Sequence, residues 1–273
     1  MDLQTQMDVL SDHDINHIEM RGVNGKCVVE YSLEEVREIK EQLDERGFKI
    51  SAVGSPLGKI DITDEFKPHF DLFLHTLDVA KILETNYIRM FSFWIPEGQH
   101  EKYRDEVMNR WQQFIDEVEG TDFILLHENE KEIYGDTPEH CLDLMETMDS
   151  DHLQAIFDPA NFVQWDVETY PEAYNMLENY IEYLHIKDAL YSDHSVVPAG
   201  NGDGKVKEIL QELAQKGFDG YLSLEPHLGS FEGLSELEKD PKYKDLEDGG
   251  PKKFAMAAEA LKSIIKEIGE NWQ

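Results

Sequence analysis

Four short apolar runs in this sequence end in side chains that can bind a metal ion or transfer a proton. Glu128 ends "DFILLHE", Asp158 follows "LQAIF", His185 lies in "YLHIKD", and Glu225 follows "YLSL". Three carboxylates and one imidazole form a ligand set that suits Mn²⁺, Mg²⁺, Co²⁺ or Zn²⁺. Carboxylates gathered without a cation would repel one another. We therefore predict one divalent metal ion bound by all four residues.

The register of the first of these runs needs a choice between two glutamates. Glu128 and Glu130 have the same parity along the strand, so alternation does not separate them. We choose Glu128 as the ligand because it directly ends the apolar run. His127 has the opposite parity and is expected to have a structural role.

The elements that must position these side chains alternate along the chain. Seven β-rich runs are apolar almost throughout before their polar ends, as expected for parallel strands that are covered on both faces. The segments between them have helical periodicity. The runs span residues 17–21, 49–55, 87–94, 122–128, 153–159, 183–188 and 221–226.

Helix start signals support this order. Ser32 and Glu35 form a predicted capping box ahead of a helix that ends near Gly47. Thr137 is a predicted N-cap, with Pro138 at the first helical position. A further helical pattern ends at residue 217. Each strand is thus followed by its own helix.

Repeated strand–helix units without a linker predict a single TIM-type (β/α) barrel domain over residues 1–273. An open doubly wound sheet is the alternative, but no G-x-G-x-x-G motif follows an early strand. Leu3, Met7 and Leu10 share one face of an initial helix, and no strand pattern precedes it. We therefore expect a barrel that lacks or alters its first strand. Strand edges exposed by such a gap would either lower stability or favour association, and association would give a homo-oligomer.

Composition excludes several classes of protein. The formal net charge is −33, which disfavours nucleic acids and anionic membranes as partners. No apolar stretch is long enough to span a membrane, and the N-terminus has no signal-peptide pattern. Cys27 and Cys141 are expected to be reduced thiols. These features predict a cytoplasmic protein.

The motifs "LLHEN", "FDPAN", "HIKDA", "GNGDG" and "LSLEPH" resemble those of the sugar phosphate isomerase/epimerase family, the xylose isomerase-like TIM barrels. The resemblance runs from about residue 17 to the C-terminal helix. It implies that Glu128, Asp158, His185 and Glu225 bind one divalent metal, and that the two glutamates flank the substrate as acid/base groups. "SPLGK" also looks like a recurrent loop of the family. Relatives usually have a strand before the first helix.

Other departures concern the substrate. Ketose 3-epimerases usually have a histidine three residues after the aspartate ligand, where this chain has Asn161, and their arginine after "HIKD" is absent. The resemblance therefore supports the metal site better than a ketose 3-epimerase. The related endonuclease-four proteins need additional histidine ligands, which Asn161 and "RMFSF" do not supply.

The predicted reaction is glutamate proton transfer through a metal-stabilised enediolate. Lys187, two residues after His185, can bind a hydroxyl or the enediolate, or form a salt bridge to an acid such as Asp188. Arg89 is either a buried structural ion pair or a substrate contact. Asn161 is a further candidate substrate contact. The remaining candidates are Trp94 and Phe162, as an apolar wall or as packing, and Lys59, near the site or in solvent.

Two loops have alternative roles. "AGNGDGK" at 199–205 is expected to shape the mouth of the site, with a substrate phosphate as the alternative. The acidic segment 229–250 is either a lid or a solvated loop.

Three functions follow from these patterns. The first is a divalent-metal sugar isomerase or epimerase acting on a small sugar, sugar phosphate or inositol-type substrate. The second is a keto-inositol-type dehydratase on the same site. The third is a sugar-binding barrel without catalysis.

Overall fold

A computed structural model describes residues 1–228 and 250–271 of the chain. The chain divides into two compact units, Met1–Ile156 with Tyr180–Glu182 and Phe157–Asn179 with Tyr183–Gln273. Most of the predicted lid lies outside the described residues. The single domain over 1–273 stays a prediction.

All seven predicted strands are present in one parallel sheet, in the order β1-β4-β5-β6-β7-β8-β11. This order follows the chain, as repeated strand–helix units require. Two additional two-stranded ladders, β2–β3 and β9–β10, lie in loops. The strands of the main sheet are β1 His17–Met20, β4 Lys49–Val53, β5 Tyr87–Met90, β6 Ile124–Glu128, β7 Leu153–Phe157, β8 Ile181–Ile186 and β11 Tyr221–Leu224. The short strands are β2 Gly22–Val23, β3 Lys26–Cys27, β9 Asp188–Ala189 and β10 Val196–Val197.

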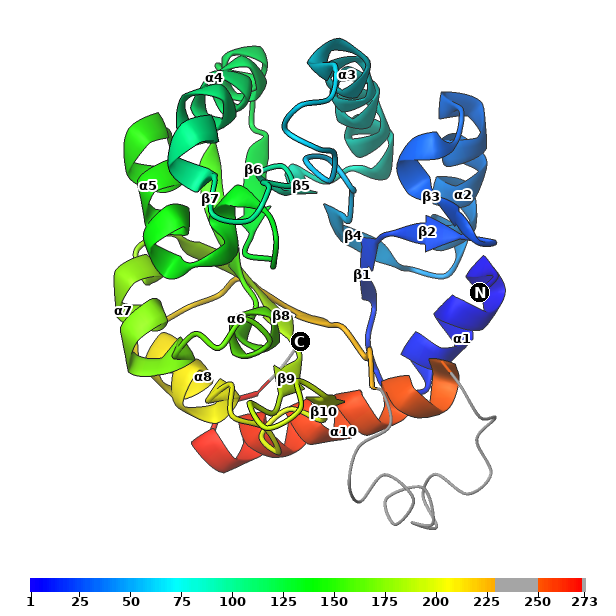
Figure 1. Ribbon diagram of the computed structural model, residues 1–273. Helices are drawn as coiled ribbons and strands as arrows, with labels where there is room; N and C mark the ends of the chain where they lie inside the picture. The colour runs from blue at the N-terminus through cyan, green and yellow to red at the C-terminus, as the bar shows by residue number, and fades with distance from the viewer. Residues whose placement is uncertain (229–249, 272–273) are drawn as a thin grey trace. The chain divides into compact units, whose positions relative to one another are not determined.

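Helices separate the strands along the chain. In the first unit, helices α2 to α5 flank strands β4 to β7 (Figure 1). In the second, α8 packs on α10. The helices are α1 Leu3–Ser11, α2 Leu33–Glu45, α3 Phe66–Leu83, α4 His100–Val118, α5 Pro138–Met148, α6 Pro159–Val163, α7 Tyr174–Leu177, α8 Val206–Gln215 and α10 Gly250–Ile268, with short helical turns at Val28–Glu30, Tyr134–Asp136 and Thr169–Ala173.

The predicted helix caps are confirmed. Ser32 Oγ accepts the N–H of Glu35 at 3.3 Å, and Glu35 Oε2 accepts the N–H of Ser32 at 2.8 Å, which completes the capping box of α2. Thr137 caps α5, with Pro138 in the first turn. The first described element is the expected helix α1, whose Leu3 and Met7 are buried.

An aromatic cluster fills part of the core of the first unit. The rings of Phe73 and Phe114 have centroids 4.7 Å apart, and those of Phe66 and Phe114 are 5.3 Å apart. These residues lie on α3 and α4, so their burial packs the two helices together. Trp111 and Phe93 join the cluster and are fully buried.

The "SPLGK" loop is held against β5 by close backbone contact. Gly58 has φ +88°, and a Cβ there would lie 2.0 Å from the carbonyl oxygen of Phe91. Its N–H donates to Nε2 of buried His69 at 2.7 Å. Burial, with a smaller contribution from the charge of Arg110, lowers the pKa of His69 to about 4. The neutral imidazole is therefore the form that supports this loop.

His69 should make the stability of the protein depend on pH. In the unfolded chain a histidine takes up a proton near about pH 6.5, but folded His69 does so only near about pH 4. The free energy of unfolding therefore keeps its full value above the pKa of the histidine in the unfolded chain. It falls as pH drops from about 6.5 to about 4, by about 1 kcal/mol per pH unit. A His69→Gln variant, in which an amide oxygen can accept the Gly58 N–H, should lose this contribution.

Urea unfolding at several pH values between about 7 and about 5 measures the effect. The His194→Gln variant is the matched control because His194 is exposed, and it should retain the wild-type slope. An unchanged slope in His69→Gln would contradict the assignment.

Candidate metal centre

Three of the four predicted ligands lie together in the second unit. Asp158 is the N-cap of α6, directly after β7, while His185 lies near the end of β8 and Glu225 directly follows β11. The N–H of Glu225 donates to the Ile186 carbonyl at 3.3 Å, which holds Glu225 beside the end of β8.

The spacing of their ligand atoms fits a shared ion. His185 Nδ1 is 3.8 Å from Asp158 Oδ2 and 3.6 Å from Glu225 Oε1, and ligand atoms of all three residues lie within 4.8 Å of one another. Two ligands that are each roughly 2.1 Å from one tetrahedral ion lie about 3.4 Å apart. Small side-chain movements would therefore let all three bind one divalent ion.

Lys187 lies inside this group. Its Nζ is 2.7 Å from Asp158 Oδ2 and 3.0 Å from Glu225 Oε2, and its side chain is buried. A positive charge thus already lies between the two carboxylates, where like charges would otherwise repel. Both carboxylate partners belong to the predicted ligand set, whereas the carboxylate of Asp188 accepts backbone N–H groups of the glycine-rich loop.

Asp188 organises the glycine-rich loop. Its carboxylate accepts the N–H groups of Gly200, Gly202 and Gly204 at 2.8–3.0 Å, and that of Ala189 at 2.9 Å. A Cβ on Gly202 would lie 2.3 Å from Asp188 Oδ1. Burial raises the pKa of Asp188, and the backbone donors act in the opposite direction. Because these loop N–H groups bind an internal carboxylate, they are unavailable to a substrate phosphate.

Glu128, the fourth predicted ligand, ends β6 in the first unit and is buried. Arg89 on β5 lies 3.5 Å from Glu128 Oε2 and 3.2 Å from Glu19 Oε1. All three side chains are at most 5% exposed, so Arg89 offsets two buried carboxylates. Glu19 was not predicted from the sequence. The feature that could have indicated it is a carboxylate inside the predicted strand "HIEM", which forms β1.

The other residues around Glu128 follow the alternation of β6. His127 Nε2 lies 2.9 Å from Ser92 Oγ, and complete burial lowers the pKa of His127 to about 3, so it is a neutral structural group. Glu130 forms an ion pair with Lys59 at 3.2 Å. Lys59 Nζ also lies 4.1 Å from the ring centroid of Phe91, so this lysine is held by partners instead of being free in solvent.

The remaining candidates differ in exposure. Asn161 is buried, and its N–H donates to Asp158 Oδ1 at 2.9 Å, which completes the N-cap of α6. Phe162 is fully buried and packs on Phe157, which supports the packing role. Trp94 is 40% exposed and can offer an aromatic face to a ligand.

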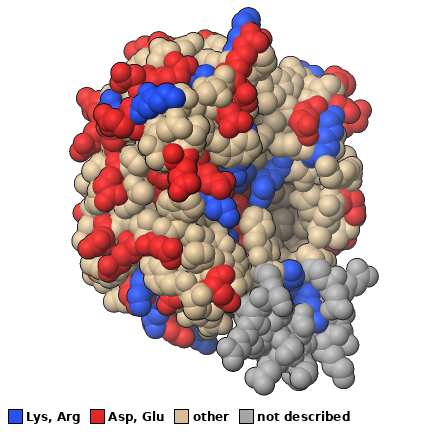
Figure 2. All heavy atoms as spheres, viewed as in Figure 1, with Lys and Arg blue, Asp and Glu red and all other residues tan. Residues whose placement is uncertain are grey.

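Acidic side chains are numerous on the face of the molecule that Figure 2 shows. They outnumber basic ones on the face in Figure 2, in agreement with the net charge of −33. No helix among residues 1–228 and 250–271 is long and apolar enough to cross a membrane.

Parallel strands that alternate with helices, with polar groups at their carboxyl ends, define an α/β protein of the TIM-barrel type. The sequence profile of the xylose isomerase-like TIM barrels matches residues 7–247, and the chain belongs to this family. No curated protein matches the sequence significantly.

Solved structures confirm the fold. The IOLI protein with a bound zinc atom is 17% identical, with TM-score 0.73 and coverage of 98% of this chain and 94% of that one. A D-psicose 3-epimerase with D-tagatose from Clostridium cellulolyticum H10 is 14% identical, with TM-score 0.71 and coverage of 99% and 95%. The probable 3-DHS dehydratase AsbF from Bacillus anthracis is 18% identical, with TM-score 0.66 and coverage of 82% and 87%.

Asp188→Asn should destabilise the second unit. The new amide group would direct N–H donors at backbone N–H groups that now share a carboxylate, leaving buried donors without acceptors. We expect a loss of about 1–3 kcal/mol in the free energy of unfolding, measured by urea denaturation.

Asp203→Asn is the matched control in the same loop. Asp203 accepts a single N–H, from Tyr191, and an asparagine oxygen can do the same. Its effect should stay within about 0.5 kcal/mol. Equal losses in the two variants would show that Asp188 has no special organising role.

Proposed function

We propose that this protein is a divalent-metal-dependent isomerase or epimerase of a small sugar, sugar phosphate or inositol-type substrate. Asp158, His185, Glu225 and Glu128 are the proposed ligands of one Mn²⁺, Mg²⁺, Co²⁺ or Zn²⁺ ion. The observation that carries the proposal is the convergence of a carboxylate, an imidazole and a second carboxylate from the ends of β7, β8 and β11. Membership of the xylose isomerase-like family and the zinc bound by the IOLI protein support it.

The fourth ligand is assigned from the order of the sheet. Glu128 ends β6, which precedes β7 in that order, and parallel strands direct their carboxyl ends to one edge. A carboxylate at this position adds a third negative charge to those of Asp158 and Glu225, which favours a divalent over a monovalent ion.

The protein groups divide the chemistry between them. A bound ion would polarise the substrate carbonyl and stabilise the charge of an enediolate. One of Glu128 and Glu225 removes the proton next to the carbonyl. The other returns a proton to the opposite face of that carbon in an epimerisation, or a proton moves to the neighbouring carbon in an isomerisation.

Lys187 can donate to the developing oxyanion through its ammonium group, which lies 2.7 Å from Asp158 and 3.0 Å from Glu225 within the same group of side chains. Arg89 and Asn161 are proposed to position the substrate. Trp94 offers a partly exposed ring on which the C–H face of a sugar can stack. Cytoplasmic location and homo-oligomeric assembly stay predictions.

A dehydratase is the second candidate, and the structural similarity to AsbF favours it. Proton removal next to a carbonyl is also the first step in the loss of water from the neighbouring carbon. The same glutamates and Lys187 would then act, with Lys187 or a glutamate protonating the departing hydroxyl. The two functions differ in product and share the site.

Incubation with a panel of sugars and keto-inositols in D₂O, with each metal added in turn, tests both reactions by NMR. We expect deuterium at the carbon next to the carbonyl for an isomerase or epimerase, and a new unsaturated product for the dehydratase. Glu225→Gln should reduce the rate at least about 100-fold, because it removes an acid/base group.

Glu208→Gln is the control, since Glu208 is an exposed residue of α8 and should retain the wild-type rate. Undiminished exchange in Glu225→Gln would reject the assigned role. Failure of the wild-type protein to bind any of the four metals would reject both enzyme functions and leave the sugar-binding barrel.

A further inference from the structure

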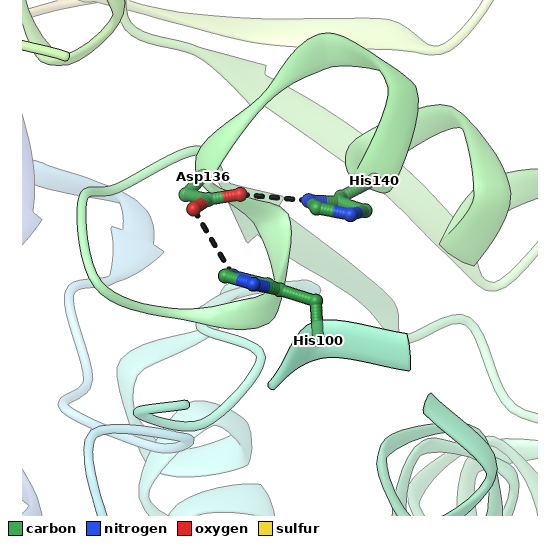
Figure 3. Close-up of side chains that lie close together, drawn as sticks. All are labelled: His100, Asp136 and His140. Atoms are coloured by element: carbon green, nitrogen blue, oxygen red, sulfur yellow. Dashed lines mark hydrogen bonds and ion pairs between the residues drawn. The ribbon is translucent and has the colours of Figure 1, made fainter. Parts of the chain in front are cut away.

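A second group of potential metal ligands lies in the first unit, on elements that the proposed reaction does not use. His100 is the first residue of α4, Asp136 ends the turn Tyr134–Asp136, and His140 lies in the first turn of α5. Figure 3 shows both imidazoles directed at the one carboxylate. His100 Nε2 is 3.0 Å from Asp136 Oδ2, and His140 Nδ1 is 2.8 Å from Asp136 Oδ1.

The possible ligand atoms of the three side chains lie close together. Their ligand atoms all lie within 4.8 Å of one another. The two imidazole rings are stacked, with centroids 4.6 Å apart and planes at 9°. His100 Nε2 also lies 3.3 Å from the Ile133 carbonyl oxygen. Each nitrogen that now faces the carboxylate can present a lone pair to an ion when the proton of the neutral imidazole lies on the other ring nitrogen.

Burial is graded across the group. The Asp136 side chain is 5% exposed, that of His100 18% and that of His140 32%. The carboxylate of Asp136 therefore lies at the buried end of the group. The two histidines lie nearer the surface, where an ion and a water molecule can enter. The strongly negative net charge of the chain also attracts cations to the surface.

The surroundings fix the group from several sides. Thr137 caps α5 next to Asp136 and receives the N–H of His140 at 3.4 Å. The Tyr134 ring lies 5.0 Å from the His140 ring, and its hydroxyl donates to Asp143 at 2.5 Å. Arg104 binds the same Asp143 through two N–H groups at 2.6 and 2.7 Å. A site with supported ligands loses little conformational entropy on binding.

We propose that His100, Asp136 and His140 form a second metal site, which binds a first-row transition-metal ion such as Zn²⁺. Two imidazole nitrogens and one carboxylate oxygen are a three-ligand set that zinc accepts, with water in the fourth position. Nitrogen ligands favour such ions over Mg²⁺ or Ca²⁺, which prefer oxygen. The bound ion would join the start of α4 to the start of α5. This proposal does not depend on the proposed function.

Zinc titration of the metal-free full-length chain, followed by calorimetry, tests the site. We expect two binding events in the wild-type protein, one of which is weakened at least about tenfold in His140→Gln. Glutamine retains a donor for Asp136, so the fold should be preserved. His100→Gln is a second variant with the same expected result. Zinc should also raise the thermal midpoint of the wild-type protein more than that of either variant.

His194→Gln is the matched control, because His194 Nε2 lies 3.0 Å from Asp166 in an exposed His–Asp pair. Among residues 1–228 and 250–271 this pair belongs to no group of three potential metal ligands. It should bind zinc as the wild type does. Unchanged zinc binding in both His140→Gln and His100→Gln would overturn the proposal. His185→Asn should remove the other event, so failure of this site and failure of the proposed function are distinguishable.

Discussion

Burying carboxylates at the ends of parallel strands requires positive charge beside them, and this constraint governs both units. In the first unit Arg89 lies between Glu19 and Glu128. In the second, Lys187 lies between Asp158 and Glu225. Such groups are costly to bury unless each finds a counter-charge or a metal ion. Burying such a cluster of charged groups costs more free energy than burying apolar side chains. Stability alone therefore does not account for these clusters.

Lysine and arginine suit different tasks in these two clusters. The guanidinium of Arg89 also donates to the carbonyls of Gly54 and Ser55, which directly follow β4, at 3.3 and 3.4 Å. Its planar fork therefore locks a local network. The ammonium of Lys187 is a point charge on a flexible chain. A flexible side chain of this kind can change position more easily than a planar guanidinium that is held by several hydrogen bonds.

In the glycine-rich loop the signs are reversed, because buried groups with partial positive charge are paired with a carboxylate. Its backbone N–H groups are positive dipole ends, and the buried carboxylate of Asp188 satisfies several at once. Loops of this composition commonly bind external anions, but here the chain supplies its own. These hydrogen bonds tie the loop to Asp188, the residue directly after Lys187.

The sequence by itself determined the local elements. The seven strands, the capping box of Ser32 and Glu35 and the Thr137 cap of α5 were all predicted, because periodicity and caps depend on residues within a few positions of one another. The order of strand–helix units also predicted the parallel sheet. The polar strand ends predicted one metal ion shared by Glu128, Asp158, His185 and Glu225, and this shared ion stays a prediction.

Only the tertiary structure decided which charges pair. The partners of Lys187 are Asp158 and Glu225, and Arg89 reaches back to Glu19 on β1. His100 meets Asp136 although a whole helix and strand separate them in the chain. Periodicity carries no information about such contacts, since they depend on strand register and on helix packing that bring distant segments together.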